Sequence, residues 1–254
     1  MKLLFLGTGT STGVPVIGCK CPTCTSADPC DKRLRASAII QYDDDTNILI
    51  DCGPDFRQQI LRAGSPPLEA LLITHSHYDH VGGIDDLRPY CKGERHFPTY
   101  CKADVADDLR SRNPWSFAKQ LYPGVPTFAI HHIEPLQPFD VAGHTILPLP
   151  VMHATLPIVG YMTGGLAYIT DCKTMPDETM QAIHNIDTLV INALRHHEHR
   201  SHLNLAQALD IISTIKPRVA YLTHLNHDIG TETSANLPPD VHFAHDGLLI
   251  HIPD

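Results

Sequence analysis

Short apolar runs that end in Thr, Asp or His recur along the whole chain, and this pattern predicts β-strands that give way to polar loops. The clearest runs are Leu3–Leu6, Ala38–Tyr42, Ile48–Asp51, Ala70–Thr74, Thr127–His131, Thr145–Leu149, Leu166–Thr170, Thr188–Asn192, Val219–Thr223 and Leu248–Ile252. Helical spacing of apolar residues is found in Asp55–Ala63, Ala103–Arg110, Pro176–His184 and Leu205–Ile215, the last with Asn204 as its N-cap. Strands outnumber helices and are mixed with them, which predicts one α/β domain over residues 1–254.

Length and composition exclude several classes of protein. With 254 residues, 43% of them hydrophobic and 19% charged, the chain can bury a sizeable core and is not intrinsically disordered. Its apolar runs stay below the ~18 residues that a membrane span requires. The net charge of −9 argues against a basic nucleic-acid-binding surface over the whole chain. Leu3–Leu6 is too short for the apolar part of a signal peptide, so we expect a cytoplasmic protein whose eight cysteines are reduced.

Two residue types are unusually frequent. There are 18 His, almost as many as the 19 Lys and Arg together, and 22 Asp stand against 6 Glu. Imidazole and carboxylate groups are ligands that borderline and hard divalent metals prefer. This composition indicates metal binding only where such residues gather at suitable positions.

The segment from Leu71 to His80 is where they gather most densely. An apolar strand runs directly into His75 and His77, which alternate and therefore point the same way at an extended strand end. Asp79 and His80 follow and can turn back toward them. A solvent-exposed, His-rich loop is the alternative interpretation, but four candidate ligands so close together at a strand end favour two adjacent metal positions.

The pattern H-x-H-x-D-H in this segment closely resembles the signature of the metallo-β-lactamase superfamily. The resemblance implies an αββα four-layer sandwich with a dinuclear metal site at one edge of its sheets. It also implies later ligands, each beyond a predicted strand: His153 after Thr145–Leu149, Asp171 after Leu166–Thr170, and His224 after Val219–Thr223. Asp51 matches a superfamily Asp that supports the metal loop without binding metal.

The resemblance further implies how the ligands divide. One metal would be held by His75, His77 and His153, the other by Asp79, His80 and His224, and Asp171 would bridge them. Asp79 and Asp171 would thus be catalytic as ligands, and a hydroxide held between the two metals would attack the substrate. The mixed His and Asp set suits Mn, Zn or Fe.

A second candidate metal site lies nearer the N-terminus, where Cys19, Cys21 and Cys24 form C-x-C-x2-C. Thiolates at this spacing suit tetrahedral zinc, whose fourth ligand could be Cys30 or a distant His. The Cys loop resembles the PhnP group of phosphodiesterases, in which three Cys and a His just after the last catalytic ligand hold a structural zinc. This implies His227 as the fourth ligand and a zinc loop at about residues 17–31. Packing is the expected role of the remaining cysteines, which are Cys30, Cys52, Cys91, Cys101 and Cys172.

A proton donor is expected in the His-rich stretch before the helix that begins near Asn204. The position of His202 is similar to that of a superfamily His that faces the metals, and a His can protonate a departing alkoxide. The sequence assigns no role to His196, His197 and His199, and leaves contact with a substrate open for them. Loops such as Lys92–Pro98 and Arg110–Val125 are expected to form the substrate pocket.

The favoured function is hydrolysis of small phosphodiesters, cyclic phosphates among them, by a dinuclear metal enzyme with one additional structural zinc. A tRNase Z-like RNA endonuclease is an alternative, which the net charge of −9 and the lack of a basic RNA-binding arm oppose. A PqqB-like protein and a non-catalytic, zinc-stapled binding protein are further alternatives, which the complete ligand set opposes. The superfamily resemblance also suggests a homodimer, and we expect neither a membrane nor a nucleic acid as partner.

Overall fold

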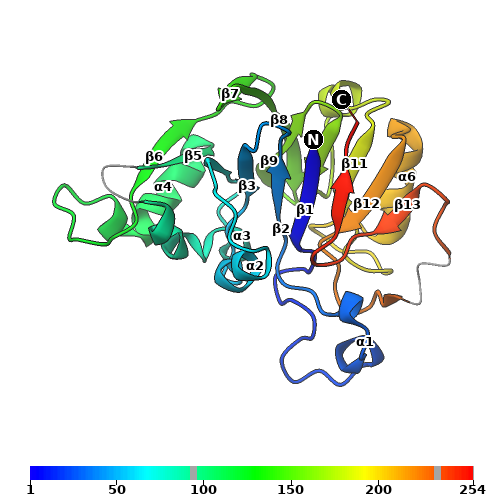
Figure 1. Cartoon of the computed structure of the whole chain (residues 1–254). Helices are drawn as coiled ribbons and strands as arrows, with labels where there is room; N and C mark the ends of the chain where they lie inside the picture. Colours follow the sequence, from blue (N-terminus) through cyan, green and yellow to red (C-terminus); the bar gives the residue numbers. More distant parts are fainter. Residues whose placement is uncertain (92–95, 232–235, 254) are drawn as a thin grey trace.

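Two β-sheets pack face to face, and helices cover both outer faces (Figure 1). The computed structural model describes residues 1–91, 96–231 and 236–253. Each sheet has seven strands in the described part of the chain, in the orders β14-β1-β2-β3-β4-β5-β6 and β13-β12-β11-β10-β9-β8-β7. The predicted αββα sandwich and its single domain are confirmed.

The first sheet is antiparallel at one side and parallel at the other, from β3 to β6. Its strands are β1 (Lys2–Gly7), β2 (Ser37–Gln41), β3 (Asn47–Ile50), β4 (Ala70–Leu72), β5 (Phe97–Cys101), β6 (Phe128–His132) and β14 (Leu249–His251). The second sheet changes in the same way and is parallel from β10 to β13. Its strands are β7 (Phe139–Val141), β8 (His144–His153), β9 (Leu156–Thr163), β10 (Leu166–Ile169), β11 (Thr188–Asn192), β12 (Val219–Thr223) and β13 (Val241–Phe243).

The helices in the described residues are α1 (Pro22–Thr25), α2 (Phe56–Arg62), α3 (Tyr78–Val81), α4 (Ala103–Arg112), α5 (Asp177–Ala182) and α6 (Leu205–Ile215), with 3₁₀ segments η1 (Pro29–Asp31), η2 (Ile84–Tyr90) and η3 (Pro114–Ser116). α1 belongs to a loop that projects away from both sheets (Figure 1). Side chains of α2, α4 and η2 pack with the first sheet, and those of α6 pack with the second. In the described residues, no helix combines the length and apolar character needed to cross a lipid bilayer.

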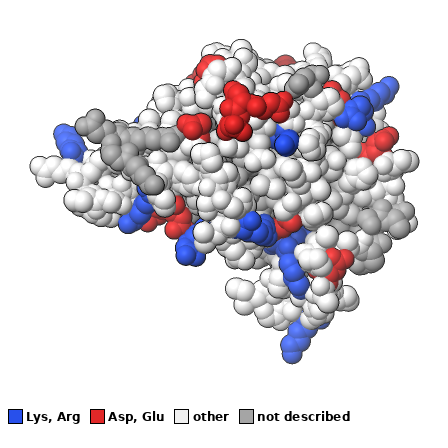
Figure 2. Space-filling view, viewed as in Figure 1, with Lys and Arg blue, Asp and Glu red and all other residues white. Residues whose placement is uncertain are grey.

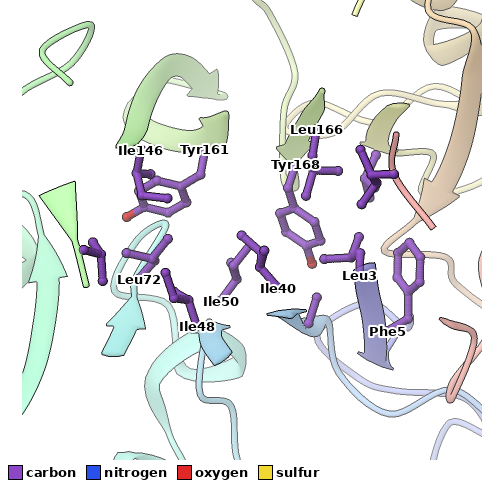
Figure 3. Packing of buried hydrophobic residues seen from close by; sticks show 14 of the residues in the cluster. Leu3, Phe5, Ile40, Ile48, Ile50, Leu72, Ile146, Tyr161, Leu166 and Tyr168 are labelled. Carbon is purple, nitrogen blue, oxygen red and sulfur yellow. The ribbon is translucent and has the colours of Figure 1, made fainter. Parts of the chain in front are cut away.

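The main core lies between the sheets (Figure 3). Ile40, Ile48 and Ile50 of the first sheet face Tyr161 and Tyr168 of the second. Burial of each such side chain contributes roughly 1.5–3 kcal/mol. The Tyr161 hydroxyl also donates a hydrogen bond of 2.6 Å to the carbonyl of Ile73, so the core is tied to the segment that precedes His75.

The predicted strands and helices are all present, with small shifts of their ends, but β5, β7, β9 and β13 were not predicted. The expected end of one strand at Leu149 is wrong, because β8 continues to His153. Pro148 and Pro150 lie within β8, although proline cannot donate a ladder hydrogen bond. β7 pairs only with the start of β8, at His144–Ile146, so the two prolines lie where the strand has a single neighbour, β9.

Candidate metal centre

Seven candidate ligands meet at one edge of the two sheets because each lies at or just beyond a strand end. They are His75 and His77 after β4, Asp79 and His80 on α3, His153 at the end of β8, Asp171 after β10, and His224 after β12. Of these side chains, only His77 is exposed. The structure therefore brings together all the residues that the superfamily resemblance implied.

One half of the site is a cluster of two carboxylates and two imidazoles. His80 Nε2 lies 3.2 Å from Asp79 Oδ2 and 3.2 Å from Asp171 Oδ2. His224 Nε2 lies 3.2 Å from Asp171 Oδ1 and 3.7 Å from Asp79 Oδ2. One ligand atom from each of the four residues falls within 4.8 Å of the others.

These atoms fit a divalent cation. His80 Nε2 and His224 Nε2 are buried and make no hydrogen bond to any described residue. Buried polar nitrogens in proteins are ordinarily hydrogen-bonded or bound to a metal. Two such nitrogens facing two carboxylates match the His and Asp donor set of a metal site.

The other half of the site contains three imidazoles. His75 Nε2 and His77 Nδ1 lie 3.0 Å apart, and the ring centroids of His77 and His153 are separated by 5.0 Å. His153 also forms a close group with Asp171 and His202. Asp171 thus lies between the two halves, which is the position of a shared ligand.

Hydrogen bonds behind the site set which nitrogen each imidazole presents. The Asp51 carboxylate accepts a hydrogen bond from His80 Nδ1 (2.7 Å) and from the Thr74 backbone N (2.9 Å) and hydroxyl (2.9 Å). Since the Thr74 hydroxyl proton is used on Asp51, His75 Nδ1 donates to that hydroxyl at 3.0 Å. His75 and His80 therefore both turn Nε2 toward the site, the arrangement that second-layer carboxylates impose on metal-binding His.

The backbone adopts uncommon conformations at three residues of the site and its support. Asp51, Asp171 and His224 have φ of 58°, 55° and 56°, in the left-handed region. Such residues cost on the order of 1–3 kcal/mol each and persist only when the surroundings fix them. Beside Asp171, the buried Asn192 amide accepts from the Cys172 N (2.7 Å) and donates to its carbonyl (3.0 Å).

The electrostatics keep the carboxylates ionised. Burial opposes this at Asp171, but the neighbouring His224 and His80 outweigh it and hold its pKa well below the usual range. Burial alone would lower the pKa of His80, but the carboxylates of Asp171, Asp79 and Asp51 outweigh it and raise that pKa well above its ordinary value. Burial and the adjacent His80 keep the pKa of His75 well below its ordinary value. The buried carboxylates of the cluster are thus negatively charged, and a divalent cation would neutralise that charge.

His202 lies over the candidate ligands. Its ring centroid is 4.6 Å from that of His153 and 4.9 Å from that of His224, and its Nδ1 is 3.5 Å from Asp171 Oδ1. Burial, followed by the effect of His224, lowers the pKa of His202 to about 3, so the imidazole is neutral at pH 7 in this state. His199 lies beside it, at 5.1 Å between centroids, whereas His196 and His197 are exposed.

The cysteine cluster forms a second, separate group. The Sγ atoms of Cys19, Cys21 and Cys24 lie 3.2, 3.4 and 3.5 Å from His227 Nδ1. These separations suit tetrahedral zinc with bonds of about 2.3 Å to sulfur and about 2.0 Å to nitrogen. A hydrogen bond from the Cys24 backbone lowers the pKa of Cys21 to about 7, which favours the thiolate. Cys30, on η1, does not belong to this group of described residues.

Several supporting residues were not predicted from the sequence. Thr74, Asn192 and Ser201 all hold site residues in place, Ser201 by accepting a hydrogen bond from His153 Nδ1 at 2.9 Å. Thr74 adjoins the motif and could have been considered on that ground. Asn192 and Ser201 carry no spacing signal, because only the folded chain brings them to the site.

Comparison with known proteins identifies the family. Residues 46–225 match the β-lactamase superfamily domain, and the chain belongs to that superfamily. Its structure is similar to the crystal structure of a diphosphatase from the PhnP family, with a TM-score of 0.92, 37% identity, and coverage of 98% of this chain and 96% of that one. Zn²⁺-bound PqqB from Methylobacterium extorquens (TM-score 0.82, 20% identity, 99% and 100% coverage) shares the fold.

The sequence is also similar to an octanoyltransferase from Porphyromonas gingivalis. The two are 45% identical over 251 residues, which make up 98% of this chain. The aligned region is 51% of that protein, so the chain spans about half the length of this relative.

We expect Cys21→Ser to release one zinc ion per chain and to lower the unfolding temperature, because it removes one of four clustered donors. Elemental analysis and thermal unfolding measure the two effects. Cys30→Ser is the matched control and should retain the zinc. Equal zinc content in both variants would contradict the assignment of the cysteine site.

Gly53→Ala should displace α3, because a Cβ at Gly53 would come within 2.0 Å of the Asp79 carbonyl. We expect roughly 1–3 kcal/mol of destabilisation, as for other overpacked sites, and a reduced content of active-site metal. Chemical denaturation and elemental analysis provide the readouts. Gly143→Ala, at φ of 89° with open space around it, should lower stability but leave the metal content unchanged.

Proposed function

We propose that the chain is a dinuclear metal-dependent phosphodiesterase that hydrolyses small phosphodiesters, cyclic phosphates among them. The observation that carries the proposal is the buried group formed by Asp79, His80, Asp171 and His224, with unpartnered imidazole nitrogens facing carboxylates. The 37% identity to a PhnP-family diphosphatase over nearly the full length supports chemistry at phosphorus.

The proposed ligand sets follow the two halves of the site. His75, His77 and His153 would hold one divalent ion, Mn, Zn or Fe; Asp79, His80 and His224 would hold the other, and Asp171 would be shared. When bound, the two ions would supply charge stabilisation for an anionic phosphoryl group. The residues around them orient the ligands: Asp51 fixes His80 directly and His75 through Thr74.

His202 is proposed to protonate the leaving oxygen. It is neutral in the free site because burial and His224 lower its pKa. An anionic phosphate placed beside the ring would raise that pKa, so substrate binding would favour the protonated imidazole that donates to the leaving oxygen. General acid catalysis of this kind typically increases the rate of the chemical step by roughly 10²- to 10⁴-fold.

The proposed structural zinc would join two distant parts of the chain. Cys19, Cys21 and Cys24 belong to the loop at about residues 17–31, and His227 lies three residues after His224. Backbone hydrogen bonds from Thr10 N to the Leu225 carbonyl (3.0 Å) and from Leu225 N to the Thr8 carbonyl (2.9 Å) reinforce this connection. The zinc would therefore restrain the backbone that carries His224.

Acyl transfer is the second candidate, because of the relative named octanoyltransferase. A covalent acyl transfer needs an accessible nucleophile. Cys172, next to Asp171, is fully buried, and burial raises its pKa to about 12. We therefore favour phosphoester hydrolysis over acyl transfer for this chain.

Two further candidates have less support. RNA cleavage is opposed by the face drawn in Figure 2, where Lys and Arg side chains are interspersed with acidic and uncharged ones and form no continuous basic surface. A PqqB-like or purely binding role does not account for the complete set of ligands. Within the predicted pocket loop Arg110–Val125, Trp115 lies on η3 and its Nε1 donates to Asp85 at 3.1 Å. Residues 92–95 of the other predicted pocket loop lie outside the described part. A cytoplasmic homodimer remains part of the proposal.

The test is a substrate screen of the protein reconstituted with Mn²⁺ or Zn²⁺. We expect hydrolysis of bis(p-nitrophenyl) phosphate and faster hydrolysis of a cyclic phosphodiester. Octanoyl thioesters and pre-tRNA are included as substrates of the alternative functions, and we expect no turnover of either. Turnover of the thioester or the RNA alone would contradict the proposed function.

His202→Ala should lower kcat roughly 10²- to 10⁴-fold, by loss of the proton donor, and leave the metal content unchanged. His197→Ala, an exposed neighbour, is the matched control and should retain full activity. Elemental analysis accompanies the kinetics. Loss of metal in His202→Ala would instead make His202 a ligand and overturn its assignment as the acid.

A further inference from the structure

Ser76, which separates His75 from His77, is held by both of its polar groups. Its hydroxyl donates a short hydrogen bond to Asp108 Oδ2, and its carbonyl accepts one of 2.6 Å from Arg112 Nη1. Arg112 Nη2 in turn donates to Asp108 Oδ2 at 3.0 Å. The three residues therefore form a closed ring of hydrogen bonds between α4 and the loop that carries the first candidate ligands.

Helix α4 offers a firm base for this ring. Val105, Ala106 and Leu109 are buried on its inner side and pack with Phe97 and Phe128 of the first sheet. The helix lies along β5 and β6 in Figure 1. Asp108 and Arg112 are one turn apart and about half exposed, so their mutual attraction alone contributes little to the stability of the fold.

The hydrogen-bonded ring contacts the metal loop beside His77, whose side chain has fewer supporting hydrogen bonds than that of His75. His75 is buried and is fixed through Thr74 and Asp51. His77 is exposed, and the side-chain contact of its Nδ1 is to His75, itself a candidate ligand. The His77 carbonyl accepts backbone hydrogen bonds from His80 N (3.0 Å) and Val81 N (3.2 Å), which fix its far side to α3. On the side toward His75, the backbone of Ser76 is the point at which the separation of His75 and His77 can be set.

We propose that Ser76, Asp108 and Arg112 form a positioning clamp that fixes the separation of His75 and His77 and thereby sets the metal affinity of that half of the site. None of the three is a candidate ligand. The proposal rests on the dinuclear centre of the proposed function and adds to it the residues that determine how tightly one metal binds. Loss of a group that orients ligands typically weakens metal binding by about 10- to 100-fold.

The test compares D108A and R112A with D107A and R110A. Asp107 and Arg110 form an ion pair of 3.0 Å on the same helix, so the control removes the same kind of charges away from the metal loop. Calorimetric titration of the metal-free proteins with Mn²⁺ measures affinity, and thermal unfolding of the metal-free proteins measures stability. We expect D108A and R112A to weaken one of two Mn²⁺ binding steps about 10-fold or more, with unfolding temperatures equal to those of the controls.

Two further variants separate positioning from a general structural effect. S76A removes only the hydroxyl and should weaken the same Mn²⁺ binding step. S76T keeps a hydroxyl and should bind Mn²⁺ in that step with the wild-type affinity. At saturating Mn²⁺ the kcat of D108A should return toward the wild-type value, because the clamp acts through metal affinity. Affinities of D108A and R112A equal to the controls would overturn the clamp alone. A wild-type protein with no Mn²⁺ binding at this site would overturn the clamp and the proposed function together.

Discussion

The buried carboxylate of Asp51 is the group on which the arrangement of the site depends. It accepts hydrogen bonds from His80 and from both the backbone and the hydroxyl of Thr74, and through Thr74 it fixes the tautomer of His75. A buried carboxylate is costly to desolvate unless its oxygens are satisfied, and here the partners that satisfy it are the supports of two candidate ligands. The stability of this part of the fold and the orientation of the site therefore have the same physical origin.

The fold brings the partners of Asp51 together through its strand ends. β3 ends beside β4 in a parallel pair, so Asp51 follows one strand while Thr74 and His75 follow the other. β9 joins this edge from the second sheet, with Val159 N donating to the Thr74 carbonyl at 3.2 Å. The two sheets are thus connected at the site as well as through the core between them.

Much of this could be predicted from the sequence, because its strongest signals are local. The alternation of His75 and His77 and the apolar strand before them identify the site without any knowledge of the fold. The strand β9 and the supports Asn192, Asp108 and Arg112 could not be predicted in the same way. Their roles arise from contacts between segments distant in sequence, and an Asp–Arg pair spaced by four residues is ordinary on any exposed helix.

The cysteine group shows the same contrast. The C-x-C-x2-C spacing indicates zinc, but the choice of His227 over Cys30 needed the family resemblance, and the structure places His227 with the three cysteines. A buried guanidinium supports the same junction independently: Arg33 Nη1 donates to the carbonyls of Asn226 (3.0 Å) and Ile229 (2.7 Å). The loop around His227 is therefore anchored from two directions.

The most direct test of the central claim, that the buried His and Asp residues form a two-metal centre, is a crystal structure of the Mn²⁺-reconstituted protein with anomalous data collected at the manganese edge. The account predicts two peaks about 3.5–4 Å apart, one beside His75, His77 and His153 and the other beside Asp79, His80 and His224, with Asp171 between them. A fully loaded protein with a single peak, or with peaks away from these residues, would contradict it.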